Sequence, residues 1–137
     1  PVPTHGDDYE KRKVTLKDAI GDLPEPNSKL AESIPNHITT SHKVKINGYI
    51  GNRKLDWNRP GPTMVGRGGG TGGPVIAVHP NLKRRLSVRE TARIQSFPDG
   101  YVFSGSKSSQ YRQIGNAVAV GFAKALGEML LKIESER

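Results

Sequence analysis

Residues 68–73 have the residue types of a phosphate-binding loop. Their letters, GGGTGG, satisfy the spacing G-x-G-x-x-G that cradles a dinucleotide. That chemistry requires a loop between a strand and a helix, with an acidic residue about 20 positions later. Here Pro74 and an apolar run at 75–78 follow instead, and the first carboxylate after the loop is that of Glu90. We therefore expect a flexible loop whose bare backbone approaches a ligand closely.

The sequence contains no cysteine, which removes disulfides, thiolate metal sites and any cysteine nucleophile. His37 and His42 could in principle share a metal ion, but no other histidine and no paired carboxylate clusters with them. We expect no metal site, and we expect the histidines to lie on the surface or in hydrogen bonds. No spacing of serine, histidine and acidic residues supports a catalytic arrangement, so no residue is predicted to be catalytic.

Positive charge is concentrated in the middle of the chain. The 137 residues carry a formal net charge of +8 at pH 7, and between residues 43 and 112 basic side chains outnumber acidic ones by 13 to 3. Such a segment is typical of a protein that binds a polyanion, because neutralising phosphates releases condensed counterions. A basic surface that serves only solubility is the alternative. No apolar run approaches the length of about 18 residues that a membrane span needs, so none is predicted.

The helices that must position these groups begin at capping boxes. Thr15 with Asp18, and Ser87 with Glu90, have the spacing at which a hydroxyl and a carboxylate cap the first turn reciprocally. We expect helices at 15–20, at 87–96 and at 119–135. Apolar residues at spacings of three and four form one stripe along the last of these: Phe122, Leu126, Met129, Leu130 and Ile133.

The expected strands are 43–47, which alternates polar and apolar residues, and 75–78. Glycine and proline dominate 57–80 and predict loops there. The expected fold class is α+β, with short antiparallel strands and loops followed by helices.

Two segments in the last third resemble conserved motifs of one enzyme family. Residues 84–99, RRLSVRETARIQSFPD, resemble the ninth motif of the DNA (cytosine-5)-methyltransferases, and residues 111–118, YRQIGNAV, resemble their tenth and last motif. The order and spacing of the two also match. One departure is Ala119, where the family usually has proline.

Weaker similarity extends the resemblance over nearly the whole chain. Residues 57–64 and 76–80 resemble the end of the family's variable target-recognition region, and 14–24 resemble the piece after its eighth motif. The resemblance implies an N-terminal loop at 1–13, a target-recognition region at 14–80, and a unit at 81–137. That last unit holds the motif-nine helix, motif ten and a C-terminal helix that packs on a partner catalytic domain.

Enzymes of this family flip a cytosine out of the duplex and methylate its C5 atom from S-adenosylmethionine, using a thiolate in a Pro-Cys motif. That motif and the glycine-rich turn of the cofactor cleft are absent here. The resemblance therefore implies the C-terminal part of such an enzyme, inactive without its catalytic half. It would be the small subunit of a two-chain enzyme or an excised fragment. The alternative is a stand-alone, non-catalytic DNA-binding module on the same scaffold.

The implied partners are double-stranded DNA and the catalytic large domain or subunit, in a cytoplasmic restriction-modification system, with no membrane. Asn116 and Val118 match positions that contact S-adenosylmethionine, and Thr63 matches a position beside the backbone of the flipped nucleotide.

Arg53 and Arg67 could read guanine, since arginine pairs with its O6 and N7 atoms. For Arg84 and Arg89 in motif nine, a DNA contact and a structural role both remain open, with the structural role favoured. Arg93 shares their helix and the same two interpretations.

Overall fold

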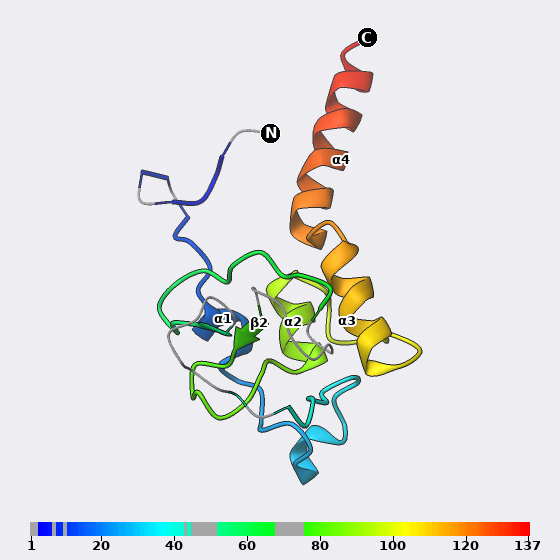
Figure 1. Cartoon of the computed structure of the whole chain (residues 1–137). Helices are drawn as coiled ribbons and strands as arrows, with labels where there is room; N and C mark the ends of the chain where they lie inside the picture. The colour runs from blue at the N-terminus through cyan, green and yellow to red at the C-terminus, as the bar shows by residue number, and fades with distance from the viewer. Residues whose placement is uncertain (1–2, 7, 10, 43, 45–51, 68–75) are drawn as a thin grey trace.

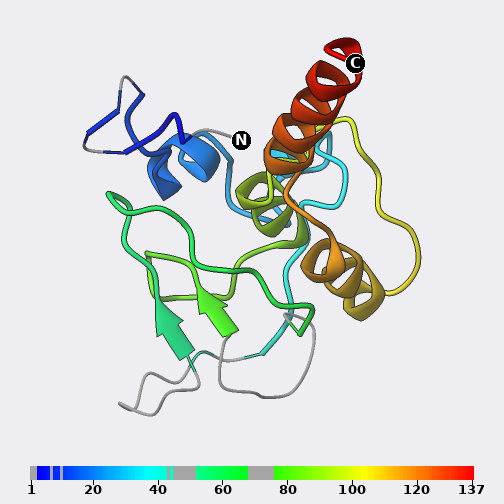
Figure 2. The same ribbon diagram turned by 90° about the horizontal axis from the view of Figure 1, so that it is seen from above.

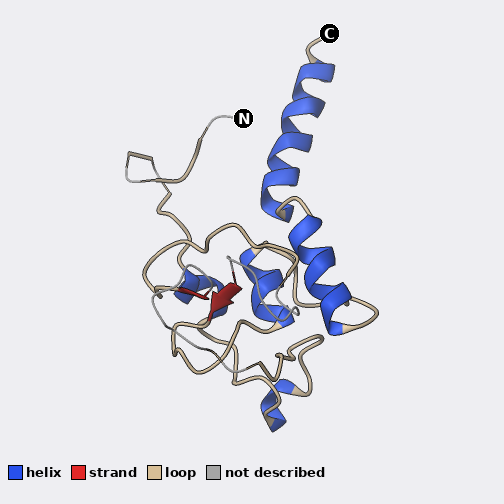
Figure 3. Ribbon diagram, in the orientation of Figure 1, coloured by secondary structure: helices blue, strands red, loops and turns tan. Residues whose placement is uncertain are grey.

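The structure is a computed structural model that describes residues 3–137 except 7, 10, 43, 45–51 and 68–75. The elements are α1 (Leu16–Ile20), the 3-10 helix η1 (Lys29–Ala31), β1 (Asn52–Lys54), β2 (Ile76–Val78), α2 (Val88–Ile94), α3 (Lys107–Asn116) and α4 (Val120–Ser135). Figures 1 and 3 show a body of loops and short elements around α1, β2 and α2, from which α4 projects. The fold is α+β, as the sequence predicts.

The first helix, α1, forms because both partners of its capping box are in place. The hydroxyl of Thr15 accepts from the amide of Asp18 at 3.3 Å, and the Asp18 carboxylate accepts from the amide of Thr15 at 2.8 Å. Leu16 and Ile20, four residues apart on one face, are buried. They pack in the first core cluster with Leu55, Met64 and Leu86. The cap thus sets the helix so that its apolar face packs into this core cluster.

The second helix, α2, is the most enclosed element. Its capping box is also formed, because Ser87 and Glu90 each accept a hydrogen bond from the other's backbone amide, at 3.0 and 2.7 Å. The helix ends at Ile94, and the left-handed backbone of Ser96, at φ 56°, turns the chain before Pro98. Val88 and Ala92, on its inner face, belong to the second core cluster. The other buried members of that cluster are Phe103, Tyr111 and Ile114.

The two strands pair in parallel, which corrects the predicted antiparallel arrangement. Asn52 lies opposite Ile76 and Lys54 opposite Val78, and Figure 2 shows the strands side by side. A parallel pair needs a connection of a dozen or more residues, and the segment 55–75 is longer than that. The strand predicted at 75–78 is confirmed over Ile76–Val78 as β2, and residue 75 lies outside the described residues. The one predicted at 43–47 lies outside the described residues apart from Val44.

The third helix, α3, is not predicted by the sequence, whereas α4 is. Lys107–Ser135 contains an apolar stretch long enough, by composition, to cross a membrane. Residues 117–119 are not helical, however, and they divide it into two helices. The 16 residues of α4 span about 24 Å, less than the ~30 Å of hydrocarbon in a bilayer. It also carries charged residues such as Lys124 and Glu128. We therefore treat α4 as a surface helix with an apolar stripe.

Candidate DNA and cofactor interface

Val65 and Gly66 lie directly against α3, and two glycines make this approach possible. A Cβ atom added at Gly115 would lie 2.1 Å from the backbone nitrogen of Gly66. A Cβ atom added at Gly66 would lie 3.0 Å from the Cα atom of Arg112. Backbone therefore packs on backbone at this point, which a side chain at Gly115 would prevent. The contact joins the end of the predicted recognition region to motif ten.

Helix α3 buries one face and exposes the other. The Tyr111 hydroxyl donates a hydrogen bond to the Leu86 carbonyl at 2.6 Å, and Ile114 is fully buried. Burial raises the pKa of Tyr111 well above its usual range, so the hydroxyl stays protonated and remains a donor. Arg112 and Asn116 are exposed, and their spacing of four places them on one side of the helix.

The end of α3 is held by Gln95, which the sequence analysis did not single out. Its side-chain amide donates to the carbonyls of Ile114 and Ala117, both at 3.2 Å. Its own backbone carbonyl accepts from the amide of Val120 at 3.1 Å. Gln95 therefore joins the end of motif nine to both sides of the α3–α4 junction. The sequence signal was its position at the end of a capped helix, but its partners lie 19 and more residues away.

The two residues predicted to contact the cofactor lie at this braced junction. Asn116 is the last residue of α3 and is exposed, and Val118 is 58% exposed. Both side chains are therefore accessible to a molecule that this chain does not supply. Their cofactor role stays a prediction.

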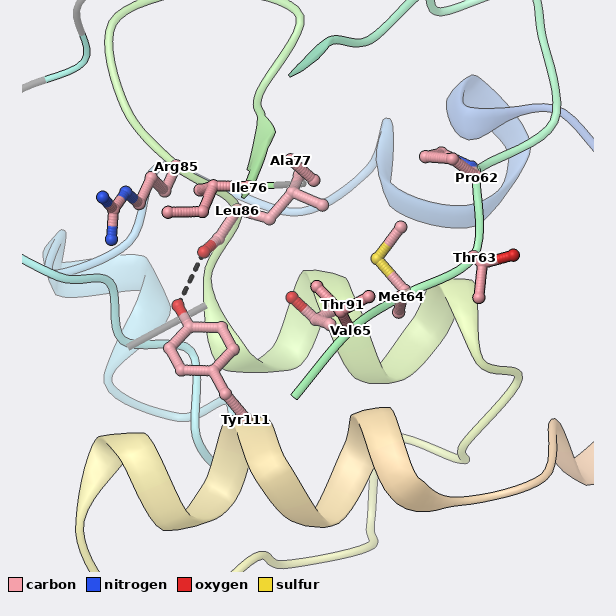
Figure 4. Close-up of a pocket in the computed structure, with 10 residues that line it drawn as sticks. All are labelled: Pro62, Thr63, Met64, Val65, Ile76, Ala77, Arg85, Leu86, Thr91 and Tyr111. Carbon is pink, nitrogen blue, oxygen red and sulfur yellow. Dashed lines mark hydrogen bonds between the residues drawn. The ribbon is translucent and has the colours of Figure 1, made fainter. Parts of the chain in front are cut away.

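A small cavity of about 20 Å³ lies where residues 62–65, β2, α2 and α3 meet. Met64, Leu86 and Tyr111 are among the residues that line it (Figure 4). It is about large enough for one water molecule, not for a nucleoside or a methyl donor. Thr63 also borders this region, but it is exposed and its hydroxyl points away from Tyr111 (Figure 4). Any ligand of Thr63 therefore binds at the surface.

Arg84 is committed to an internal ion-pair network. It donates two hydrogen bonds to Glu90, each 2.8 Å long, and one to Glu25 at 2.7 Å. The side chain of Glu90 is 1% exposed, so its charge needs this partner. The bond from Arg84 also lowers the pKa of Glu25. Arg84 therefore stabilises the start of α2, which favours its structural role over a contact with DNA.

Arg89 is fully buried, which favours its structural role over a contact with DNA. Its guanidinium donates to three backbone carbonyls, those of Pro35 at 2.8 Å, Pro98 at 3.0 Å and Tyr101 at 2.6 Å. The first of these carbonyls lies 54 residues away in the sequence and the other two lie 9 and 12 residues away, so Arg89 ties two separate loops to α2.

Arg93, on the same helix, pairs with Asp22 and Asp99. Its hydrogen bonds lower the pKa of Asp99 and keep that carboxylate charged. This arginine also serves to join segments of the chain.

The remaining DNA-contact predictions fall on residues that the structure places only in part. Arg67 is exposed beside the glycine contact, and its role stays a prediction. The backbone of Arg53 lies in β1, but its side chain is outside the described residues. The glycine-rich run 68–73 is outside them as well.

His37 is buried and hydrogen-bonded, as predicted. One ring nitrogen lies 2.9 Å from the hydroxyl oxygen of Ser87, and the other lies 2.6 Å from the carbonyl oxygen of Pro24. Among the described residues, no three histidine or carboxylate side chains gather to form a metal site.

Helix α4 presents an apolar face that the described residues leave uncovered. No residue of α4 is buried, and Phe122, Leu130 and Ile133 are 56%, 62% and 47% exposed. Apolar side chains of this size at helical spacing are usually covered, because their burial is favourable by about 1.5–3 kcal/mol each. The face adjoins Val118 and the motif-ten junction.

Comparison with known proteins agrees with this arrangement. The sequence pattern of the family described as C-5 cytosine-specific DNA methylase matches residues 3–132. The chain belongs to this family.

Its relatives include plant and microbial proteins. The chain is 41% identical over 113 residues to DNA (cytosine-5)-methyltransferase 3 of Arabidopsis thaliana, a match to 80% of this chain and 8% of that protein. It is 33% identical over 140 residues to the type II methyltransferase M.Eco47II of Escherichia coli, covering 95% and 31%. It is 35% identical over 147 residues to M.MthTI of Methanothermobacter thermautotrophicus, covering 88% and 44%. The chain thus spans less than half the length of these curated relatives.

Proposed function

We propose that this chain is the DNA-recognition and cofactor-cleft-completing part of a DNA (cytosine-5)-methyltransferase. The complete enzyme transfers a methyl group to C5 of a flipped cytosine, and this chain is inactive without the catalytic half. Because two relatives are named type II methyltransferases, we place it in a restriction-modification system of the cytoplasm.

The observation that carries the proposal is the uncovered apolar face of α4 beside the α3–α4 junction. Phe122 and Leu130 need a cover, and Asn116 and Val118 next to them are exposed. A catalytic half that packs on α4 would cover the stripe and bring its cofactor to Asn116 in one step. The absence of cysteine points the same way, because the attacking thiolate must then come from another part of the enzyme.

The exposed junction has the chemistry to form one wall of a cofactor cleft. The Asn116 amide both donates and accepts hydrogen bonds, so it fits the polar groups of S-adenosylmethionine, and Val118 supplies an apolar contact. Bound there, S-adenosylmethionine supplies the methyl group. The hydrogen bonds from Gln95 keep the junction in place, so Asn116 needs little reorganisation to bind.

On the DNA side, the chain positions its groups through the segment 63–67. The exposed Thr63 hydroxyl can donate to a phosphate oxygen beside the flipped nucleotide. Arg67 can donate two hydrogen bonds to the O6 and N7 atoms of a guanine, and Arg53 is the second candidate for this role. A stand-alone DNA-binding module would use these groups too, but it would gain nothing from Asn116 and Val118 beside an apolar face.

Co-expression tests the proposal. The probe is the remainder of M.MthTI with the segment that matches this chain removed, produced with or without this chain in a methylation-deficient host. Bisulphite sequencing is expected to find methylated cytosines in one sequence context when both are present, and none with either part alone. Methylation that does not depend on this chain would show that it is not part of the enzyme. DNA binding with no methylation by the pair would favour the stand-alone module.

A further inference from the structure

Arg112 is an exposed cation on α3 that has no partner within the described part of the chain. The arginines of α2 are different, because Arg89 donates to three carbonyls and Arg93 pairs with two carboxylates. Their charge is used inside the domain, whereas that of Arg112 is available to a group from outside.

The glycine contact places Arg112 next to a second available arginine. The Cα atom of Arg112 lies 3.0 Å from the position that a Cβ atom on Gly66 would occupy. Arg67 follows Gly66 directly, is exposed, and likewise has no partner among the described residues. The backbones of two exposed arginines from segments far apart in sequence therefore lie at one contact.

Arg67 and Arg112 both add positive charge near this backbone contact, so both attract an anion that comes close to Arg112. The segment that carries Arg67 also carries Thr63, and Arg112 shares the exposed side of α3 with Asn116. An anion bound by Arg112 would thus lie between the predicted DNA contacts and the predicted cofactor contact. In an enzyme acting on duplex DNA, the anion there is a backbone phosphate.

We infer that Arg112 binds a DNA phosphate beside the base contact proposed for Arg67, at the backbone contact between Gly66 and Gly115. The inference rests on the proposed function, in which this chain recognises duplex DNA. In this role Arg112 fixes the recognition segment on the duplex and carries no sequence information, because every nucleotide presents the same phosphate.

Salt-dependent DNA binding by the full chain tests the inference. Affinity for fluorescein-labelled duplexes of several sequences is measured over a range of salt concentrations for the wild type, Arg112→Ala and Arg112→Lys. Arg112→Ala is expected to weaken binding to every duplex by roughly tenfold at low salt. It should also reduce the slope of log K against log salt by about 0.9, the value for one phosphate contact. Arg112→Lys keeps the charge and should keep the slope.

Lys29→Ala is the matched control. It removes one positive charge from η1, which lies at the bottom of Figure 1, away from the α3–α4 junction, and should leave both quantities unchanged. Because Arg112 is exposed, the variants should unfold at the wild-type temperature. If Arg112→Ala unfolds earlier, a full slope retained by Arg112→Lys still supports the phosphate contact, and a reduced slope contradicts it.

Three results would overturn the inference. They are an unchanged slope for Arg112→Ala, an equal effect of Lys29→Ala, or a loss of affinity for one sequence alone. If the reconstituted pair still methylates DNA, any of these leaves the proposed function standing. A wild-type chain with no salt-dependent affinity for duplex DNA would contradict both.

Discussion

At the scale of single residues, Gly115 does what no other residue type could do at its position. It lies in α3, where glycine costs about 0.5–1 kcal/mol relative to alanine. That cost is offset by the backbone contact with Gly66, which a Cβ atom would block at 2.1 Å. The steric effect exceeds the gain in helix propensity, because the opposing atoms are backbone and cannot rotate away.

Gly115→Ala is therefore expected to lower the free energy of unfolding by about 1–3 kcal/mol, the range for overpacking. Urea unfolding measures it. Gly100→Ala is the control, because an added Cβ atom there meets nothing within 4 Å; its change should stay within about 0.5 kcal/mol. A stabilising Gly115→Ala would show that residues 63–67 do not rest on α3.

His79 makes stability depend on pH. It is 6% exposed, its Nδ1 atom accepts from the amide of Asn81 at 3.2 Å, and Nε2 lies 3.7 Å from Glu90. Burial lowers the pKa of His79 below its ordinary value of 6.5, and the charge of Arg84 adds to this, while Glu90 opposes it. The folded state thus holds a neutral imidazole.

Because the unfolded chain then binds the proton more readily, stability falls as the pH drops below 6.5 toward the folded pKa. His79→Gln is expected to flatten the curve of unfolding free energy against pH just below 6.5. Urea unfolding at closely spaced pH values measures the curve. A wild-type stability that rises as the pH falls through this window would contradict the neutral, buried state.

At the scale of elements, the helices differ in how far neighbouring residues in the sequence determine them. The capping boxes at Thr15 and Ser87 predicted α1 and α2 nearly to the residue, because a cap needs only neighbours in the sequence. Helix α3 was missed because its ten residues, KSSQYRQIGN, are mostly polar. It is held by Tyr111 and Ile114 in the core and by Gln95 at its end. The parallel pairing of β1 and β2 was missed because it depends on the path of the long connection.

The same distinction applies to the candidate site. Asn116 and Val118 could be found by resemblance, because motif ten is continuous in sequence. The hydrogen-bond partners of Arg89 could not be found in this way, because its three acceptors come from loops up to 54 residues away. Sequence reveals that an arginine is charged, but the fold decides whether the charge faces a carbonyl or DNA.

Helix α4 carries the prediction that belongs to this scale. Its stripe is exposed in the chain, so amides 122–133 should exchange with deuterium rapidly when the chain is alone and slowly when a catalytic half covers them. Hydrogen exchange with and without the remainder of M.MthTI measures this. Amides that are already protected in a monomer, and unchanged by the partner, would mean that the stripe is covered within the chain.

At the scale of the whole molecule, the chain divides into a buried frame and an open side. The frame uses Arg84, Arg89 and Arg93 as internal links between segments. The open side contains the segment 63–67, the exposed face of α3 and the stripe of α4. Basic charge remaining on that side suits DNA, and the apolar stripe suits a protein partner. A chain that spans less than half of its relatives presents the surfaces expected of one part of an enzyme.

Transfer of tritiated methyl groups from S-adenosylmethionine to duplex DNA tests this division of labour most directly. The purified chain is assayed alone, and then titrated into a fixed amount of the remainder of M.MthTI. Because the chain has no cysteine to attack the cytosine ring, transfer should be absent for the chain alone. It should rise with added chain and saturate at equimolar amounts. Methyl transfer by the chain alone would contradict this division of labour. A transfer rate of the catalytic part that added chain does not change would contradict it as well.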